Sequence, residues 1–111
     1  PQRLSRISEV PLRPGMILSN EPGYYREGAF GIRLENLIVV EEAEKIGDGR
    51  DQLAFETLTF VPFDRRLVLV EELSGAERRW LNAYHAAVLG KLSARLSPEA
   101  RTWCEAACAA L

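Results

Sequence analysis

Residues 15–36 read GMILSNEPGYYREGAFGIRLEN, and this stretch carries the strongest fold signals of the chain. Residues 16–21 form an apolar run that stops at Pro22-Gly23, which predicts a short strand followed by a turn. Residues 24–31 hold two glycines and mixed charge, and we interpret them as a loop. Residues 32–41 are rich in β-branched and apolar side chains, which predicts a second strand buried on both faces. The two strands and the loop suit an antiparallel hairpin.

Two glutamates lie in these apolar strands, where a charged side chain is not expected without a partner. Glu21 ends the first strand and Glu35 lies inside the second. Ionised glutamate is almost never buried unless it is paired or bound to a cation. If the two residues lie opposite one another, their Cβ atoms are about 4.5–5.5 Å apart and the carboxylates repel. A positive group between them is therefore expected.

The sequence offers two candidates for that positive group. Arg33 lies two residues before Glu35 and hence on the same strand face, which would give a structural Arg–Glu network. The other candidate is a pair of divalent metal ions about 3.5–4 Å apart, bridged by one of the carboxylates. Spacing does not decide between them. Two carboxylates do not complete such a site, so the remaining ligands would have to come from outside this chain.

The rest of the chain predicts an α+β fold, with strands first and helices second. A charged, glycine-containing turn at 41–52 leads to a third strand at about 55–61, and residues 67–70 are expected to be extended. Helices are expected at about 74–92 and 97–110. We therefore divide the chain into two parts, 1–61 and 62–111.

The helix limits rest on local signals. Ser74 and Glu77 form a capping box, and Ser97 followed by Pro98 marks the start of the last helix. Apolar residues recur at helical spacing. The first stripe contains Trp80, Leu81, Tyr84, Val88 and Leu92, and the second contains Trp103, Ala107 and Leu111. These stripes predict an intramolecular core, with a dimerisation element as the alternative.

Composition excludes several classes of protein. The chain has 111 residues, of which 47% are hydrophobic and 27% charged, with 14 Lys and Arg against 16 Asp and Glu. The net charge of −2 argues against nucleic-acid binding. No apolar run approaches the roughly 18 residues that span a bilayer, so no membrane partner is expected. Because the chain begins at Pro1 and its single methionine is Met16, we expect a processed product or a fragment.

The cysteines and the histidine have unremarkable sequence contexts. Cys104 and Cys108 are one helical turn apart, which is poor geometry for a disulfide, and we expect them to be small apolar residues on a buried helix face. The lack of a disulfide framework favours a reducing compartment such as the cytoplasm. His85 is the only histidine and is expected to pack on the helix rather than bind a metal.

The motifs GMILSNEPGYY at 15–25 and GAFGIRLEN at 28–36 resemble the end of the catalytic domain of the pita-bread metallopeptidases. Within that superfamily the chain is similar to the Xaa-Pro aminopeptidases (aminopeptidase P). Residues 1–3 match the segment after the family's His-Glu-Gly motif. FETLT at 55–59 and WLNAYH at 80–85 are similar to the C-terminal extension of the longer, cytosolic type.

The resemblance implies a specific chemistry. The family hydrolyses the bond between an N-terminal residue and a following proline, with two divalent ions, commonly manganese. The resemblance places metal ligands on Glu21 and Glu35, with Glu21 also handling a proton of the attacking water. It makes Arg33 a catalytic residue that orients a metal-bound carboxylate. The aromatic residues Tyr24, Tyr25 and Phe30 are candidates for the wall of the substrate pocket.

The chain also departs from the family pattern. The family's two Asp ligands and its His ligand have no counterpart here. In the family the two Asp ligands come well before the first Glu ligand, whereas Asp48, Asp51 and Asp64 all follow Glu35. We therefore expect the chain alone to be inactive, to hold no metal tightly and to self-associate, while the intact enzyme is expected to be a cytoplasmic homodimer. The alternatives are a prolidase-like or creatinase-like hydrolase, and a pita-bread protein that has lost its metals and binds other proteins.

Overall fold

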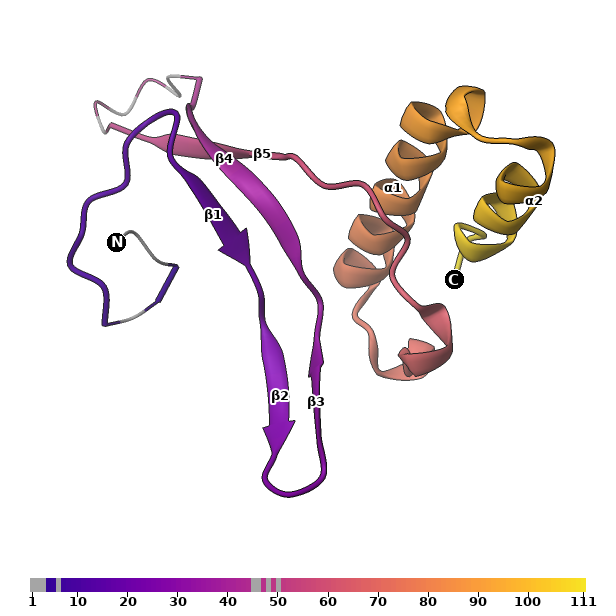
Figure 1. Cartoon of the computed structure of the whole chain (residues 1–111). Helices are drawn as coiled ribbons and strands as arrows, with labels where there is room; N and C mark the ends of the chain where they lie inside the picture. The colour runs from indigo at the N-terminus through magenta and orange to yellow at the C-terminus, as the bar shows by residue number, and fades with distance from the viewer. Residues whose placement is uncertain (1–3, 6, 45–46, 48, 50) are drawn as a thin grey trace. The chain divides into compact units, whose positions relative to one another are not determined.

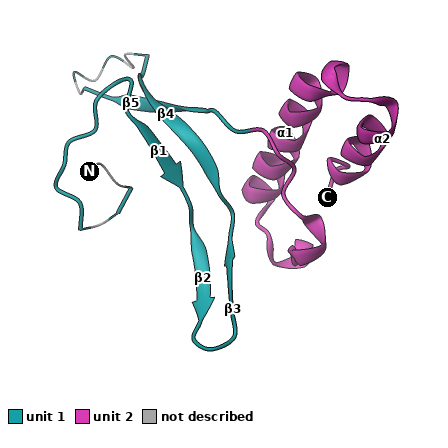
Figure 2. Ribbon diagram, viewed as in Figure 1, with its two compact units in different colours: residues 1–59 teal, residues 60–111 magenta. Residues whose placement is uncertain are grey.

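A computed structural model describes residues 4–5, 7–44, 47, 49 and 51–111. The expected match at residues 1–3 and part of the expected turn at 41–52 lie outside these residues. The chain forms two compact units, 1–59 and 60–111 (Figure 2). None of the described helices is long and apolar enough to cross a membrane.

Unit 1 consists of β-strands. Its five strands are β1 (Ile17–Asn20), β2 (Gly23–Arg26), β3 (Phe30–Arg33), β4 (Asn36–Glu42) and β5 (Leu53–Thr57). The first, fourth and fifth form an antiparallel sheet in the order β1-β4-β5, while β2 and β3 pair separately. Figure 1 shows that β1 runs on into β2 and that β3 runs back into β4, as one long ribbon.

The register is continuous along this ribbon. The last β1–β4 pair is Asn20 with Asn36, and the first β2–β3 pair is Gly23 with Arg33. One step from the first of these pairs brings Glu21 opposite Glu35. At the next step Pro22, which has no N–H to donate, offers only its carbonyl oxygen, which accepts from Leu34 N at 3.1 Å. The expected hairpin is confirmed, and the break in its ladder falls at the two glutamates.

Three details of the strands differ from expectation. The segment 24–31 is not a loop, because β2 and β3 occupy most of it. The expected strand at 32–41 is divided into β3 and β4, since the ladder is broken beside Pro22. The third strand spans Leu53–Thr57 rather than 55–61. It ends earlier because Leu37 N donates to the Thr59 hydroxyl, at 2.9 Å, and not to a backbone carbonyl of a continued strand.

The core of unit 1 lies on one face of the sheet only. Leu18, Ile38 and Val40 are buried, and Leu12 and Met16 pack against them. Leu37, which points to the opposite face, is 42% exposed. The expectation that this strand is buried on both faces is therefore wrong within this chain. Strand β4 alternates between buried and exposed side chains, as a sheet covered on one side does.

Unit 2 is helical. Its two α-helices are α1 (Gly75–Leu92) and α2 (Pro98–Ala107), and three short 3-10 turns lie at Arg65–Leu67, Val70–Glu72 and Ser93–Arg95. The capping box is present, with Glu77 N donating to Ser74 Oγ at 3.2 Å and Ser74 N donating to Glu77 Oε2 at 2.8 Å. Ser97 caps α2 in the same way. Of residues 67–70, expected to be extended, Val68 and Leu69 have extended backbone angles, whereas Leu67 and Val70 belong to two of these turns.

The core of unit 2 is formed by the centre of the α1 stripe and by the two cysteines. Leu81, Tyr84, Val88, Cys104 and Cys108 are buried. Both cysteines are free thiols, as expected, and burial together with the neighbouring Cys104 raises the pKa of Cys108 to about 11.

The two tryptophans do not belong to this core. Trp80 is 56% exposed and Trp103 is 63% exposed, so their assignment to the buried stripes is wrong. Trp80 lies at the edge of the buried face of α1, where its ring stacks on Tyr84 with centroids 5.9 Å apart. Helical spacing therefore located the stripe correctly but did not show which of its members are covered.

Candidate metal and proton-transfer site

The two glutamates and the arginine come together on one face of the ribbon. Arg33 Nη1 lies 3.2 Å from Glu21 Oε2, and Arg33 Nε lies 3.5 Å from Glu35 Oε2. The three side chains are about half exposed, at 45% for Glu21, 43% for Glu35 and 49% for Arg33. The predicted cation between the carboxylates is therefore present as Arg33. Its single charge does not balance two carboxylates, so the cluster keeps a net negative charge.

Ser19 also contacts this cluster, from the β1 side of the hairpin, where it lies two residues before Glu21. Its hydroxyl donates to Glu21 Oε1 at 2.7 Å, while Arg33 donates to the other oxygen of the same carboxylate. The Ser19 hydroxyl and the Arg33 charge lower the pKa of Glu21, which is ionised at neutral pH. Sequence reasoning did not select Ser19. The signal that could have found it is period two, because residues 19 and 21 share one strand face.

Two glycines make room for the larger side chains of this face. A Cβ at Gly23 would lie 2.8 Å from Arg33 Cγ and 3.0 Å from the Tyr25 hydroxyl, and a Cβ at Gly31 would lie 2.8 Å from Tyr25 Cδ1. The Tyr25 ring therefore lies over Gly31, and its hydroxyl reaches over Gly23 toward Arg33. The proximity of Tyr25, together with Glu35 and Glu21, raises the pKa of Arg33.

The three aromatic candidates divide between the two faces of the ribbon. Tyr25 shares a face with Glu21 and Gly23, because alternate residues of a strand point the same way. Tyr24 points to the opposite face, and Phe30 pairs with Arg26, whose side chain also lies on that opposite face. The rings of Tyr24 and Phe30 lie 6.1 Å apart. Of the three, only Tyr25 lies on the strand face of the carboxylates, where it is close to Arg33.

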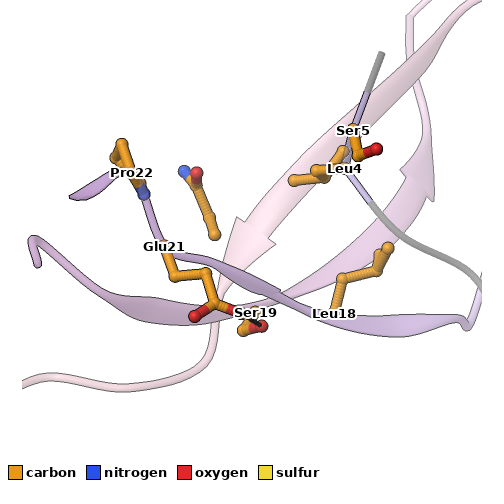
Figure 3. A pocket seen from close by; sticks show the side chains of 7 residues that line it. Leu4, Ser5, Leu18, Ser19, Glu21 and Pro22 are labelled. Atoms are coloured by element: carbon orange, nitrogen blue, oxygen red, sulfur yellow. Dashed lines mark hydrogen bonds between the residues drawn. The ribbon is translucent and has the colours of Figure 1, made fainter. Parts of the chain in front are cut away.

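A cavity of about 490 Å³ borders the cluster at β1, an edge strand of its sheet. Residues 4–5 and 18–22 line it. Figure 3 shows the Glu21 carboxylate turned toward Ser19 within this lining. Because the Glu21 side chain is 45% exposed, a small solute can reach it.

The donor set fits hard divalent cations in part. Carboxylate oxygens are the ligands that Mn²⁺ and Mg²⁺ prefer, and two of them face one another here with half their surface open. No group of three His, Cys, Asp or Glu side chains suitable for a metal occurs among the described residues. His85 is fully buried in unit 2, where its Nε2 accepts from Phe63 N at 3.1 Å, so it packs on the helix as expected.

The chain belongs to metallopeptidase family M24. The model for the C-terminal region of peptidase M24 matches residues 51–111, and that for metallopeptidase family M24 matches residues 1–42. The antiparallel ribbon, the sheet and the two following helices are thus the C-terminal part of the pita-bread α+β fold, as expected.

Similar proteins carry a consistent description. A probable Xaa-Pro aminopeptidase P of Sclerotinia sclerotiorum is 51% identical over 89 residues, which cover 78% of this chain and 15% of the relative. A protein of the same description from Arthroderma benhamiae is 52% identical, with 78% and 13% covered.

A solved structure similar to this chain has a description that agrees with those of the relatives. The X-prolyl aminopeptidase of Caenorhabditis elegans, described as a cytosolic enzyme with a di-nuclear active site, aligns with a TM-score of 0.75 at 34% identity. The alignment covers 90% of this chain and 17% of the C. elegans chain. The chain therefore spans about one seventh of the curated relatives' length.

Proposed function

We propose that the chain works as the C-terminal part of a metal-dependent Xaa-Pro aminopeptidase, which hydrolyses the bond between an N-terminal residue and a following proline. The observation that carries this proposal is the pair Glu21 and Glu35, opposed across the hairpin with Arg33 between them. The descriptions of the relatives support it. Residues 1–61 belong to the catalytic domain, and residues 62–111 form its C-terminal extension.

Glu21 and Glu35 are two ligands of a dinuclear site whose other ligands lie outside this chain. Two bound divalent ions, manganese in this proposal, lower the pKa of a water molecule and polarise the scissile carbonyl group. When the ions are bound, the carboxylate oxygens of Glu21 and Glu35 would hold them. The di-nuclear site of the C. elegans enzyme supports the number of ions.

The residues of the ribbon supply proton transfer and orientation. Glu21 accepts a proton from the attacking water molecule and returns it to the proline nitrogen as the peptide bond to that nitrogen breaks, a role that requires an ionised, accessible carboxylate. Both conditions are met, since Glu21 is half exposed and its pKa is lowered. Arg33 restrains both carboxylates through its two contacts. Tyr25 is the pocket-wall candidate that shares their face, while Tyr24 and Phe30 face the other way.

The working form in this proposal is a cytoplasmic homodimer. The description of the C. elegans relative as cytosolic supports the compartment. The exposed rings of Trp80 and Trp103 support a contact through residues 74–111, because large exposed apolar groups gather at interfaces.

The test of function uses the complete polypeptide that contains these residues. Loaded with Mn²⁺, it is expected to release the first residue from a peptide of the form Xaa-Pro-Xaa, and Glu21→Gln is expected to lower kcat by about 10²- to 10⁴-fold. Cleavage of free Xaa-Pro dipeptides alone would support the prolidase-like alternative. A protein that binds no metal and cleaves none of these peptides would support the metal-free binding module.

The isolated 111-residue chain is the negative control for this test. It is expected to show no steady turnover of the same peptide with Mn²⁺, because two carboxylates do not complete the site. It is also expected to self-associate in light scattering, since Leu37 and other apolar side chains of the sheet are exposed. Steady turnover by this chain would contradict the proposed division of ligands.

A further inference from the structure

We propose that Ser19 is a positioning residue of this site, which fixes the rotation of the Glu21 carboxylate so that its remaining lone pairs point at the metal. The inference rests on the proposed function, because it requires Glu21 to be a metal ligand.

The direction of the hydrogen bond follows from its chemistry. Glu21 is ionised and can only accept, so the Ser19 hydroxyl is the donor of the 2.7 Å bond to Oε1. A bond of this length from a hydroxyl to a charged oxygen belongs to the strong, charge-assisted class. The strand itself sets the geometry, since Ser19 and Glu21 stand two residues apart on one face near the end of β1.

The two oxygens of Glu21 are held by different partners. Ser19 holds Oε1, and Arg33 Nη1 holds Oε2 at 3.2 Å from across the hairpin. The terminal torsion of a glutamate is broad, so an exposed carboxylate held at one oxygen still rotates. Held at both oxygens, its plane is fixed by two contacts that approach from separate strands. Arg33 alone does not fix the plane of the Glu21 carboxylate, because it contacts only Oε2 of Glu21 and its Nε contacts Glu35 instead.

The position of the pair matches this role. Ser19 and Glu21 both border the cavity beside β1. The Glu21 carboxylate is turned toward Ser19 (Figure 3), and its side chain is 45% exposed, so that an ion and its water can reach it. Groups that orient metal ligands in this way typically change metal affinity or activity by about 10- to 100-fold when removed.

The test compares Ser19→Thr with Ser19→Val. The two variants have the same shape and similar strand preference, and they differ only in whether a hydroxyl is present. In the complete peptidase, stripped of metal and titrated with Mn²⁺ by calorimetry, Ser19→Thr is expected to keep the affinity within about threefold. Ser19→Val is expected to weaken it about 10-fold or more. Thermal unfolding of both variants controls for the fold.

A second measurement uses the 111-residue chain and needs no activity. Mn²⁺ is paramagnetic and broadens the NMR signals of nearby amides even when it binds weakly. The Mn²⁺ concentration that broadens the amides of residues 19–35 is expected to be raised by Ser19→Val and by Glu21→Gln, but not by Ser19→Thr.

The outcomes separate the two proposals. Equal Mn²⁺ affinity of the Thr and Val variants, in a wild-type enzyme that cleaves its peptide, would overturn the role of Ser19 and leave the proposed function standing. A wild-type protein that neither binds Mn²⁺ nor cleaves the peptide would overturn both. A loss confined to Val and rescued by Thr would establish the positioning role.

Discussion

The hairpin of unit 1 and the helical pair of unit 2 use polar contacts in opposite ways. Around Glu21, Arg33 and Glu35 the side chains are about half exposed and are held by a hydroxyl and one guanidinium. Around Tyr84 and His85 the side chains are buried and hold backbone atoms of residues 61–63. Exposed ion pairs add little to stability, whereas the loss of a buried hydrogen bond leaves an unsatisfied group.

This contrast predicts that the two regions respond differently to mutation. Changes in the hairpin are expected to alter metal binding and activity with little effect on unfolding. Changes in the helical pair are expected to do the reverse. The chain offers a convenient probe, because both of its tryptophans lie in unit 2 and their fluorescence reports the unfolding of that unit.

The largest expected effect is that of Glu35→Gln. Loss of the carboxylate removes a proposed bridging ligand, and kcat of the complete peptidase is expected to fall by about 10²-fold or more. The midpoint of urea unfolding of the 111-residue chain is expected to change little, since the side chain is half exposed. Glu71→Gln, an exposed change in unit 2, is the control that keeps activity. Retention of most of the activity by Glu35→Gln would remove this residue from the site.

Tyr84→Phe is expected to have the next largest effect, and on stability alone. The Tyr84 hydroxyl donates to Val61 O at 2.8 Å and accepts from Val61 N at 3.2 Å. Its removal is expected to cost about 1–2 kcal/mol in the unfolding of unit 2, measured by tryptophan fluorescence in urea. The matched control is Tyr24→Phe in the hairpin, followed by circular dichroism in urea because both tryptophans lie in unit 2. Its ring is 63% exposed, and the change is expected to stay within about 0.5 kcal/mol. Equal costs at the two tyrosines would contradict the contrast.

Gly23→Ala tests whether Arg33 requires the space that the missing side chain of Gly23 leaves. The added Cβ would meet Arg33 Cγ at 2.8 Å, so the Arg33 side chain must shift from the position in which it contacts both carboxylates. Activity of the complete peptidase is expected to fall about 10-fold, in the range for groups that orient metal ligands. Gly90→Ala in α1 meets no atom within 4 Å and is expected to stabilise unit 2 by about 0.5–1 kcal/mol without changing activity. Unchanged activity in Gly23→Ala would show that Arg33 tolerates displacement.

The smallest expected effect is a pH dependence at His85. Burial, with the nearby Arg65 charge, lowers the pKa of His85 below its ordinary value of 6.5. The unfolded chain therefore binds a proton at His85 more readily than the folded chain does. The contribution of His85 to the free energy of unfolding is complete above pH 6.5 and is lost as the pH falls through the lowered pKa of the folded state. The carboxyl of Asp64, whose pKa is lowered to about 2 by Arg66, titrates well below this window.

The measurement compares wild type with His85→Gln. The Gln side-chain oxygen can accept from Phe63 N as His85 Nε2 does, but it does not titrate in this range. Unfolding midpoints of unit 2 between pH 8 and pH 5 are expected to fall more steeply in the wild type. Parallel curves for the two proteins would show that His85 does not carry the pH dependence.

The features that the sequence predicted correctly depend on short-range geometry. The capping box of Ser74 and Glu77 and the start of α2 at Pro98 each require only a few consecutive residues. The opposition of Glu21 and Glu35 required only that the strands pair across a tight connection, because the register then follows residue by residue. Strand alternation likewise placed Arg33 on the face of Glu35.

The features that the sequence did not predict depend on which surfaces other parts of the chain cover. Periodicity placed Trp80 and Val88 in one stripe, but packing in unit 2 buried Val88 and left Trp80 exposed. It could not show that Gly23 leaves space for the Arg33 side chain. Local spacing determined where the carboxylates stand, because backbone geometry is periodic. The tertiary structure decided how Arg33 holds them from across the hairpin, because that contact depends on the space that Gly23 leaves.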